Sequence, residues 1–268
     1  MRGELVDQIL ARLAVEAPAP DLAGLRSIYG AWCGSVPFDN TLKLIHVASG
    51  LPGPLPGSSA GAFFESWLEH GTGGTCWAGN GALHDLLQAL GFEVERAIAT
   101  MMRIASPPTP NHGSVIVRLG AQRFVADASI LSGEPIEIPA PGVTPAGSLP
   151  RFEWLEGAPS VRWRMLSAPD GFPCRIDRIG AGFDEWDELH QHTARWSPFN
   201  YELSARLLRG GRSIGAAGGQ RFAFDADGTL SASPLEGDER ARFLVDELGI
   251  SAEVAGRLPA DRPVPPRP

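Results

Sequence analysis

The sequence predicts a multidomain α+β protein, and three observations carry this prediction. The first 90 residues place apolar side chains at helical spacing between breakers, the stretch after Phe92 places them at strand spacing, and the last third mixes the two patterns. A chain of 268 residues with 43% hydrophobic residues can bury a sizeable core, so wholesale disorder is excluded.

Helices are expected in the N-terminal third. Leu5, Ile9 and Leu13 lie at the spacing of one helical face, and Asp21 is a candidate N-cap for the helix that follows. A short helix is expected over 63–69 after a loop rich in Gly and Pro. The segment 77–90 repeats leucines along one stripe and is predicted to be a helix that ends at the glycine after it.

Strands are expected from Phe92 onward. The segments 115–119 and 123–126 are predicted to form a hairpin about Gly120-Ala121, because two alternating runs flank a glycine turn. The tail from Leu258 is rich in Pro and Arg and is expected to be frayed. The remaining expected elements are strands at 151–155, 161–166 and 174–179, a helix at 183–195, strands across 203–224 with turns at Gly210-Gly211 and Gly218-Gly219, and a helix at 238–248.

Composition narrows the function classes. The formal net charge of -8 argues against nucleic-acid or anionic-membrane partners, since these need a basic surface. Three cysteines are too few and odd in number for a disulfide framework, which favours a reducing compartment. Acids at Glu4 and Asp7 break the apolar run that a secretory signal needs. A cytoplasmic protein is therefore expected.

Cys76 is the first candidate for chemistry. A thiol in the first turn of a helix faces unpaired backbone N–H groups and the positive end of the helix dipole, and both favour the thiolate. The glycines before it let the backbone approach a bound acyl group and leave amides free for an oxyanion. The alternative is that Cys76 is a small buried hydrophobe, which is the commoner role of a free cysteine.

A nucleophilic cysteine needs a base and a group that orients the base, and His112 and Asp127 are the candidates. His112 opens one strand of the expected hairpin and Asp127 ends the other. With an even number of residues in the turn, paired positions sum to an odd number, so both side chains fall on one face. An imidazole–carboxylate hydrogen bond is therefore permitted. The competing interpretations are a solvated or capping histidine and a turn-forming aspartate.

Other functional patterns are weaker. His190 and His192 point to different sides of a helix, and with the acids around them they indicate a solvent-exposed face, so no metal site is expected. The glycines at 71–74 lack the Gly-Lys-Ser/Thr ending of a phosphate-binding loop, which argues against nucleotide binding of that type. Cys33 and Cys174 have no nearby histidine and are interpreted as structural.

Several motifs together resemble the arylamine N-acetyltransferase family. The match runs from about residue 5 to residue 250, and His112 and Asp127 fall where that family places the rest of its triad. The segments that carry the resemblance are Val36-Pro37-Phe38-Asp39-Asn40, Gly73-Gly74-Thr75-Cys76-Trp77-Ala78-Gly79-Asn80, Leu86-Leu87-Gln88-Ala89-Leu90-Gly91-Phe92 and Ser197-Pro198-Phe199.

The resemblance implies a fold and a site. It implies an N-terminal helical bundle over 1–91 with the nucleophile, a β-barrel over 92–182 with His112 and Asp127, and an interdomain helix with an α/β lid over 183–268, around a papain-like Cys-His-Asp core. The residues assigned to substrate binding are Phe38, Gly74, Thr75, Trp77 and Ser129.

The resemblance also implies a ping-pong reaction. Cys76 would take an acyl group from acetyl coenzyme A, another acyl coenzyme A or an acyl carrier protein, with no bound cofactor or metal. A small amine or hydrazine would then collect the acyl group, with His112 as general base and Asp127 as its orienter.

The departures from the family pattern mark a divergent member. Thr72 stands where the family has arginine, Asp39 replaces a glutamate, and Trp77-Ala78 replaces Phe-Glu. Ser129 and Leu131 replace two glycines after the triad aspartate, and they are expected to narrow or redirect the donor pocket. Three alternatives therefore stay open beside the transferase: an amide synthase that releases carrier-bound chains, a thiol hydrolase such as a peptidase or amidase, and an idle binding module.

Overall fold

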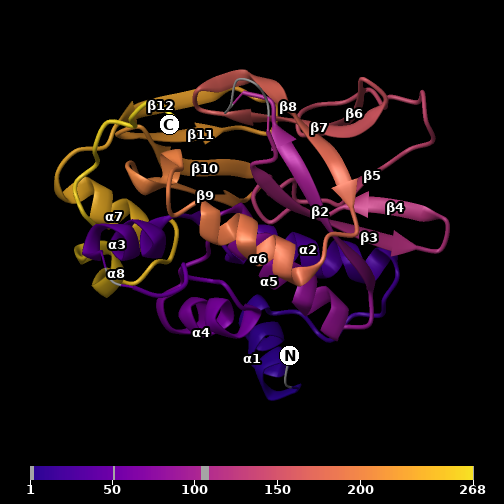
Figure 1. Ribbon diagram of the computed structural model, residues 1–268, viewed down its shortest axis with the longest axis horizontal. Helices are drawn as coiled ribbons and strands as arrows, with labels where there is room; N and C mark the ends of the chain where they lie inside the picture. The colour runs from indigo at the N-terminus through magenta and orange to yellow at the C-terminus, as the bar shows by residue number, and fades with distance from the viewer. Residues whose placement is uncertain (1–2, 51, 104–108, 268) are drawn as a thin grey trace.

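A computed structural model describes residues 3–50, 52–103 and 109–267 (Figure 1). It is an α+β fold in which helices dominate before residue 90 and antiparallel strands dominate after it. The helices are α1 Gly3–Leu13, α2 Leu22–Ser35, α3 Thr41–Ser49, α4 Ala60–His70, α5 Cys76–Ala89, α6 Phe183–His192, η1 Pro198–Asn200, α7 Asp238–Asp246 and α8 Ala252–Gly256. The strands are β1 Phe38–Asp39, β2 Glu93–Met101, β3 His112–Leu119, β4 Gln122–Val125, β5 Ile136–Glu137, β6 Arg151–Leu155, β7 Ala158–Met165, β8 Ala168–Ile179, β9 Ser204–Arg209, β10 Arg212–Ala217, β11 Gln220–Phe224 and β12 Leu230–Pro234.

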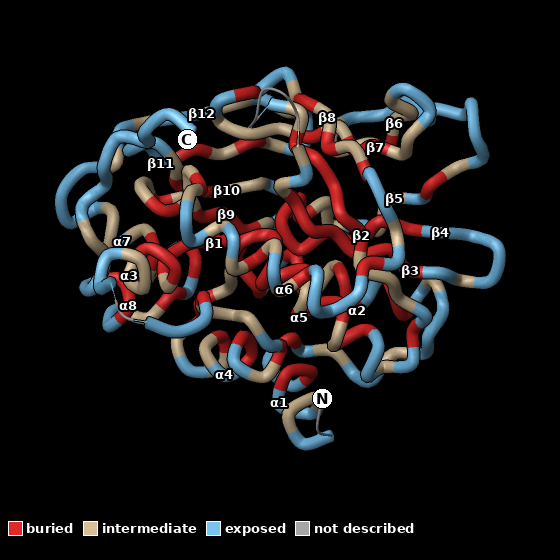
Figure 2. Tube along the Cα trace, in the orientation of Figure 1, coloured by how far each residue is buried: buried red, intermediate tan, exposed pale blue. Residues whose placement is uncertain are grey.

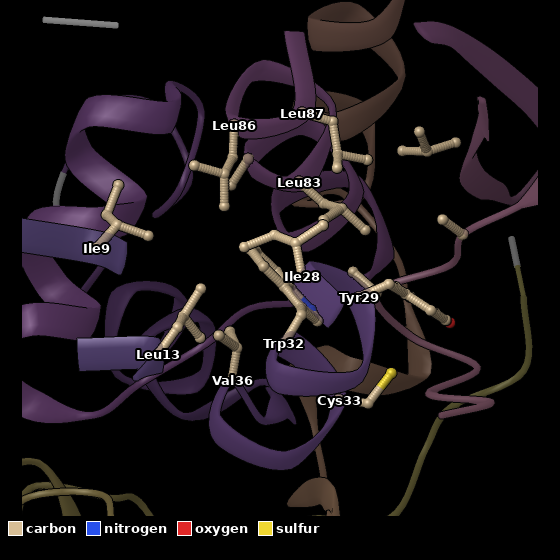
Figure 3. Packing of buried hydrophobic residues seen from close by; sticks show 14 of the residues in the cluster. Ile9, Leu13, Ile28, Tyr29, Trp32, Cys33, Val36, Leu83, Leu86 and Leu87 are labelled. Carbon is tan, nitrogen blue, oxygen red and sulfur yellow. The ribbon is translucent and has the colours of Figure 1, made fainter. Parts of the chain in front are cut away.

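The helices α1, α2, α4 and α5 form one end of the molecule and share a core. Figure 3 shows Ile9, Trp32 and Leu83 from three of these helices pointing into the same space, and all three are fully buried. Trp32 stacks on Phe63 of α4 with ring centroids 5.9 Å apart. This core holds α5 in place, and α5 begins at Cys76.

The cap of α2 and the end of α5 agree with the sequence predictions. Asp21 adopts an extended backbone, and its carboxylate accepts a hydrogen bond from Gly24 N at 2.8 Å. Gly91, just past α5, has a φ of 87°, a conformation that favours glycine. The start of α2 and the end of α5 are therefore set by the residues that the sequence predicts.

Seven antiparallel strands form the central sheet, in the order β5-β4-β3-β2-β8-β7-β6. Its two edge strands β5 and β6 contact each other, so the sheet curls into a near-barrel. One face packs on α5 through β2 and β3. Figure 2 shows the buried segments concentrated where these helices and strands meet. The predicted hairpin is confirmed: Arg118 pairs with Arg123 and Leu119 with Gln122, so paired positions sum to an odd number.

The second sheet has the order β1-β9-β10-β11-β12 and lies beside α3, α7 and α8 (Figure 1). β9, β10 and β11 are joined by the two predicted double-glycine turns, and all four glycines there have positive φ. β1 comes from the N-terminal part of the chain and pairs with β9, so that Phe38 lies opposite Arg206. This pairing brings the segment before the nucleophile next to the C-terminal sheet.

The predicted frayed tail is wrong. Arg262 N donates to Tyr201 O at 2.9 Å, Leu203 N donates to Asp261 at 2.9 Å, and Trp196 Nε1 donates to Pro265 O at 3.2 Å. Prolines cannot build a helix or a central strand, but their extended chain leaves carbonyls free to accept hydrogen bonds. The tail is therefore bound along its length.

Candidate active site

Cys76 is the first residue of α5, as the sequence predicts. Thr75 is the N-cap, yet its hydroxyl makes no capping hydrogen bond. The amides of the first turn of α5 therefore lack the usual side-chain acceptor and are available to an anionic or carbonyl oxygen. Cys76 is 6% exposed and lines a cavity.

His112 and Asp127 meet as the hairpin register requires. His112 Nε2 lies 2.7 Å from Asp127 Oδ2, and both residues are buried. Because Nε2 faces the carboxylate, Nδ1 is the ring nitrogen left for the sulfur of Cys76, and a hydrogen bond between His112 and Cys76 is among the causes that raise the pKa of His112. The structure thus brings the three residues together.

The buried side chains of His112 and Asp127 each stabilise the charged form of the other. Burial lowers the pKa of His112, but the Asp127 carboxylate and then Cys76 raise it, with a net rise well above the usual range of histidine. Burial raises the pKa of Asp127, but His112 and hydrogen bonds from its surroundings lower it well below its usual range. The two shifts therefore both favour an imidazolium facing a carboxylate over a neutral pair.

Asn80 fixes the helix to the hairpin, and sequence reasoning missed this role. One turn after Cys76 on α5, its Nδ2 donates to Gly113 O at 2.7 Å and to Asp127 Oδ1 at 3.2 Å, and its Oδ1 accepts from Ala128 N at 2.8 Å. The spacing of four residues from the nucleophile, on one helix face, is the only signal that could have found it.

A cavity of about 700 Å³ is lined by Cys76 and His112. Cys76, His112 and Asn111 form one wall, and residues of β9–β11, η1 and β7 form the others. A smaller cavity of about 90 Å³ also reaches Cys76. Cys76 therefore borders both cavities.

The residues predicted to bind substrate divide between these spaces. Phe38 and Ser129 line the large cavity, whereas Thr75 and Trp77 line the small one. Gly74 lines neither and packs near Phe63 and Ala78. Trp77 also packs edge-on against Trp186 of α6 at 4.9 Å between centroids, which makes it part of the packing between α5 and α6.

The expected effect of Leu131 on the pocket is wrong. Leu131 is 4% exposed and belongs to the helical core, and it does not line the large cavity. Its φ of 51° is in the left-handed region, which favours glycine. Its side chain packs in the helical core and does not narrow the large cavity.

Gly73 allows the nucleophile loop to lie against the segment before β1. Its N–H donates to Asp39 Oδ2 at 2.6 Å, and a Cβ at this position would lie 1.7 Å from Pro37 O. The backbones are therefore too close for any side chain.

We expect Gly73→Ala to destabilise the fold by about 1–3 kcal/mol, because the methyl group forces two backbone segments apart. Gly61→Ala is the matched control: a Cβ on this α4 residue meets only Ser59 Oγ, at 4.0 Å, and alanine is the better helix former. Denaturant unfolding should show opposite signs for the two variants. Equal effects would contradict the close approach.

Lys43, on α3, is the only lysine of the chain, and it is buried near the site. Its Nζ donates to Thr193 Oγ1 at 2.8 Å. Burial lowers its pKa to about 7, while Cys76 raises it. The pKa of His190 is lowered to about 4, mainly by burial and in addition by the charge of Lys43. The predicted solvent-exposed face at 190 is therefore wrong, because His190 is 2% exposed.

Lys43→Met should raise stability most at low pH. Unfolded Lys43 binds a proton that the folded residue loses above about pH 7, so its contribution to the free energy of unfolding rises with pH from there to its unfolded pKa. Below that window we expect the variant to be more stable by about 2 kcal/mol. Urea unfolding measures the free energy of unfolding of the wild type and the variant across pH. The difference between the two curves cancels the contribution of His112, which has the opposite sign and is present in both proteins. Parallel curves would contradict the lowered pKa of Lys43.

Between residues 3 and 267, leaving out 51 and 104–108, no group of three His, Cys, Asp or Glu side chains is placed to hold a metal ion. Over the same residues, no helix has both the length and the apolar run that crossing a bilayer requires.

Part of the chain is similar in sequence to known N-acetyltransferases. A family model for N-acetyltransferases matches residues 21–141. An arylamine N-acetyltransferase of Mycolicibacterium smegmatis is 34% identical over 125 residues, which is 44% of this chain and 43% of that protein. The matched segment thus spans less than half the length of this curated relative.

Solved structures extend the likeness to nearly the whole fold. The Mycobacterium marinum arylamine N-acetyltransferase in complex with CoA has a TM-score of 0.80 at 19% identity, over 94% of this chain and 96% of that one. The M. tuberculosis arylamine N-acetyltransferase has a TM-score of 0.77 at 17% identity, over 94% and 99%. The chain is therefore similar in sequence to an arylamine N-acetyltransferase over part of its length, and similar in fold to arylamine N-acetyltransferases over nearly all of it.

Proposed function

We propose that this protein is an acyltransferase that works through a thioester on Cys76. The observation that carries the proposal is the placement of Cys76 at the start of α5, in a cavity shared with His112, whose imidazole is hydrogen-bonded to Asp127. The acyl donor is a coenzyme A or carrier-protein thioester, with acetyl coenzyme A as the first candidate, and the acceptor is a small amine or hydrazine. The related proteins are arylamine N-acetyltransferases, and one of them is in complex with CoA.

The first half-reaction forms the acyl-enzyme. The Cys76 thiolate attacks the thioester carbonyl, and the amides at the start of α5 stabilise the oxyanion. The bond from the carbonyl to the donor sulfur then breaks, and the donor thiolate leaves with a proton from the His112 imidazolium.

The second half-reaction transfers the acyl group. The amine nitrogen attacks the Cys76 thioester, and His112, now neutral, takes the proton from that nitrogen. The amide departs and the thiolate returns, which restores the imidazolium pair with Asp127. The segments 1–91, 92–182 and 183–268 serve in this proposal as the nucleophile-bearing bundle, the barrel with His112 and Asp127, and the lid that closes the cavity.

Mass spectrometry of the intact protein tests the proposal. Incubation with acetyl coenzyme A, longer acyl coenzyme A thioesters and carrier-bound acyl thioesters should add one acyl mass to Cys76. Addition of an arylamine or hydrazine should remove it and yield the amide. Loss of the acyl group at a rate independent of amine would indicate a thiol hydrolase, and acylation by carrier-bound thioesters alone would indicate an amide synthase. The absence of any adduct would overturn the proposal.

A further inference from the structure

Arg206 is a buried cation that lines the cavity of the candidate active site and has no hydrogen-bond acceptor and no carboxylate partner among the described residues. It is 8% exposed, and its side chain lines the same cavity as Cys76 and His112. Within the described part of the chain, its side chain makes no hydrogen bond and no ion pair, and its Nε is fully buried without an acceptor. A buried charge in this condition is costly unless something compensates it.

Other partly buried arginines of this protein have a carboxylate partner, although the Nε atoms of Arg96 and Arg240 are, like that of Arg206, buried without an acceptor. Arg96 binds Asp85 at 2.6 Å, Arg162 binds Glu153 at 2.8 Å, and Arg240 binds Asp261 at 3.0 Å. Arg206 has two aromatic rings instead: its guanidinium carbon lies 4.1 Å from the ring centroid of Trp163 and 5.2 Å from that of Phe38. Arg206 therefore differs from these three arginines in having two aromatic rings and no carboxylate beside its guanidinium group.

The aromatic contacts explain how the cation is held in place. Rings stabilise a guanidinium through its faces, and they offer no acceptor to the N–H groups around its edge. Burial lowers the pKa of Arg206 to about 9, against a rise from Asp127, so the side chain stays charged at neutral pH. Asp127 is already engaged by His112, Asn80 and the amides of Ser129 and Ile130.

We infer that Arg206 binds the carboxylate of a substrate in the acyl-transfer cavity, a specificity role that rests on the proposed function. A planar guanidinium edge matches a carboxylate with two parallel hydrogen bonds, and such charge-assisted pairs are strong where water is excluded. The walls beside Arg206 are largely apolar, with Trp163, Phe38 and Phe222, which suits a hydrophobic body that ends in one carboxylate. Glu202, the acidic residue of the lining, disfavours a second negative charge.

The first test is a binding measurement that needs no acyl transfer. Benzoate and its uncharged analogue benzamide are compared for their ability to protect Cys76 from alkylation by iodoacetamide, read by peptide mass spectrometry. The buried Cys33 and Cys174 serve as internal references. We expect half-protection by benzoate at a concentration about tenfold or more below that of benzamide.

Three variants assign the preference to Arg206. Arg206→Met should abolish it, and Arg206→Lys should retain only part, because lysine offers a point charge without the two-pronged edge. Arg209→Met removes a cation from the same strand, but outside the cavity, and should keep the full preference. Equal protection by benzoate and benzamide in the wild type overturns the inference. An unchanged preference for benzoate in Arg206→Met, or the full wild-type preference in Arg206→Lys, also overturns it.

A second set of substrates distinguishes the source of the carboxylate. An acyl-borne carboxylate would make a 3-carboxypropanoyl thioester acylate Cys76 faster than a butanoyl thioester. An acceptor-borne one would make 4-aminobenzoate a better acceptor than 4-aminobenzamide. If Arg206→Met instead loses protection by coenzyme A and not by benzoate, Arg206 binds a donor phosphate and the inference is wrong. Arg206-dependent protection without any acyl transfer would mean that the proposed function fails while the carboxylate site stands.

Discussion

Cys76→Ala should abolish covalent acylation and reduce amide formation by at least about a thousandfold, the largest effect that we expect from any single change. In the proposed reaction this sulfur carries the acyl group, so the variant would have no acceptor for the first half-reaction. Cys76 also lines both cavities that reach the site, and no other cysteine does. Intact-protein mass spectrometry and amide formation, measured on the same samples, check both expectations.

Cys174→Ala is the matched control for this experiment. Cys174 is buried among β2, β7 and β8 in the barrel core, and burial raises the pKa of its thiol, so it has neither access nor reactivity. The control should acylate like the wild type. Residual acylation of Cys76→Ala would mean that another residue carries the acyl group and that the role of α5 has been misassigned.

The parts of the site that the sequence predicts are those set by local rules. The position of Cys76 follows from the glycines before it and the leucine stripe after it, which together fix the start of α5. The juxtaposition of His112 and Asp127 follows from one hairpin, since a two-residue turn about Gly120 determines the face of every residue on both strands.

The parts that the sequence does not predict depend on contacts between distant segments. β1 has two residues, too few for any periodic signal, yet its pairing with β9 places Phe38 beside Arg206. Nothing local to Arg206 distinguishes it from the other arginines; only the cavity and the two rings do. The tail was mispredicted for the same reason, because its hydrogen-bond partners near Tyr201 and Trp196 lie some sixty residues away in sequence.

Asp127→Asn should preserve the fold and lower the rate of acyl-enzyme formation by about 10²–10⁴-fold, through a change in the tautomer of His112. Asp127 Oδ1 accepts from Ser129 N at 2.8 Å, from Ile130 N at 3.0 Å and from Asn80 Nδ2 at 3.2 Å. Because three N–H groups point at the Oδ1 position of residue 127, the side-chain oxygen of the asparagine must occupy that position. The asparagine must therefore direct its NH₂ group toward His112 Nε2.

This inverted amide changes what His112 can do. Its Nε2 becomes an acceptor, so the ring proton moves to Nδ1, the atom that must accept the proton of the thiol. The charged imidazolium also loses its carboxylate, so the pKa of His112 falls toward or below its usual value and the variant's activity should depend on pH near neutrality, where the wild type's does not. A pH profile of single-turnover acylation measures both the loss and the new dependence. An Asn80→Ala variant separates charge from orientation, since it leaves the charges of the site unchanged but removes the donor that holds Asp127 Oδ1. A pH profile of Asp127→Asn parallel to that of the wild type would show that Asp127 supports the fold alone and does not orient His112.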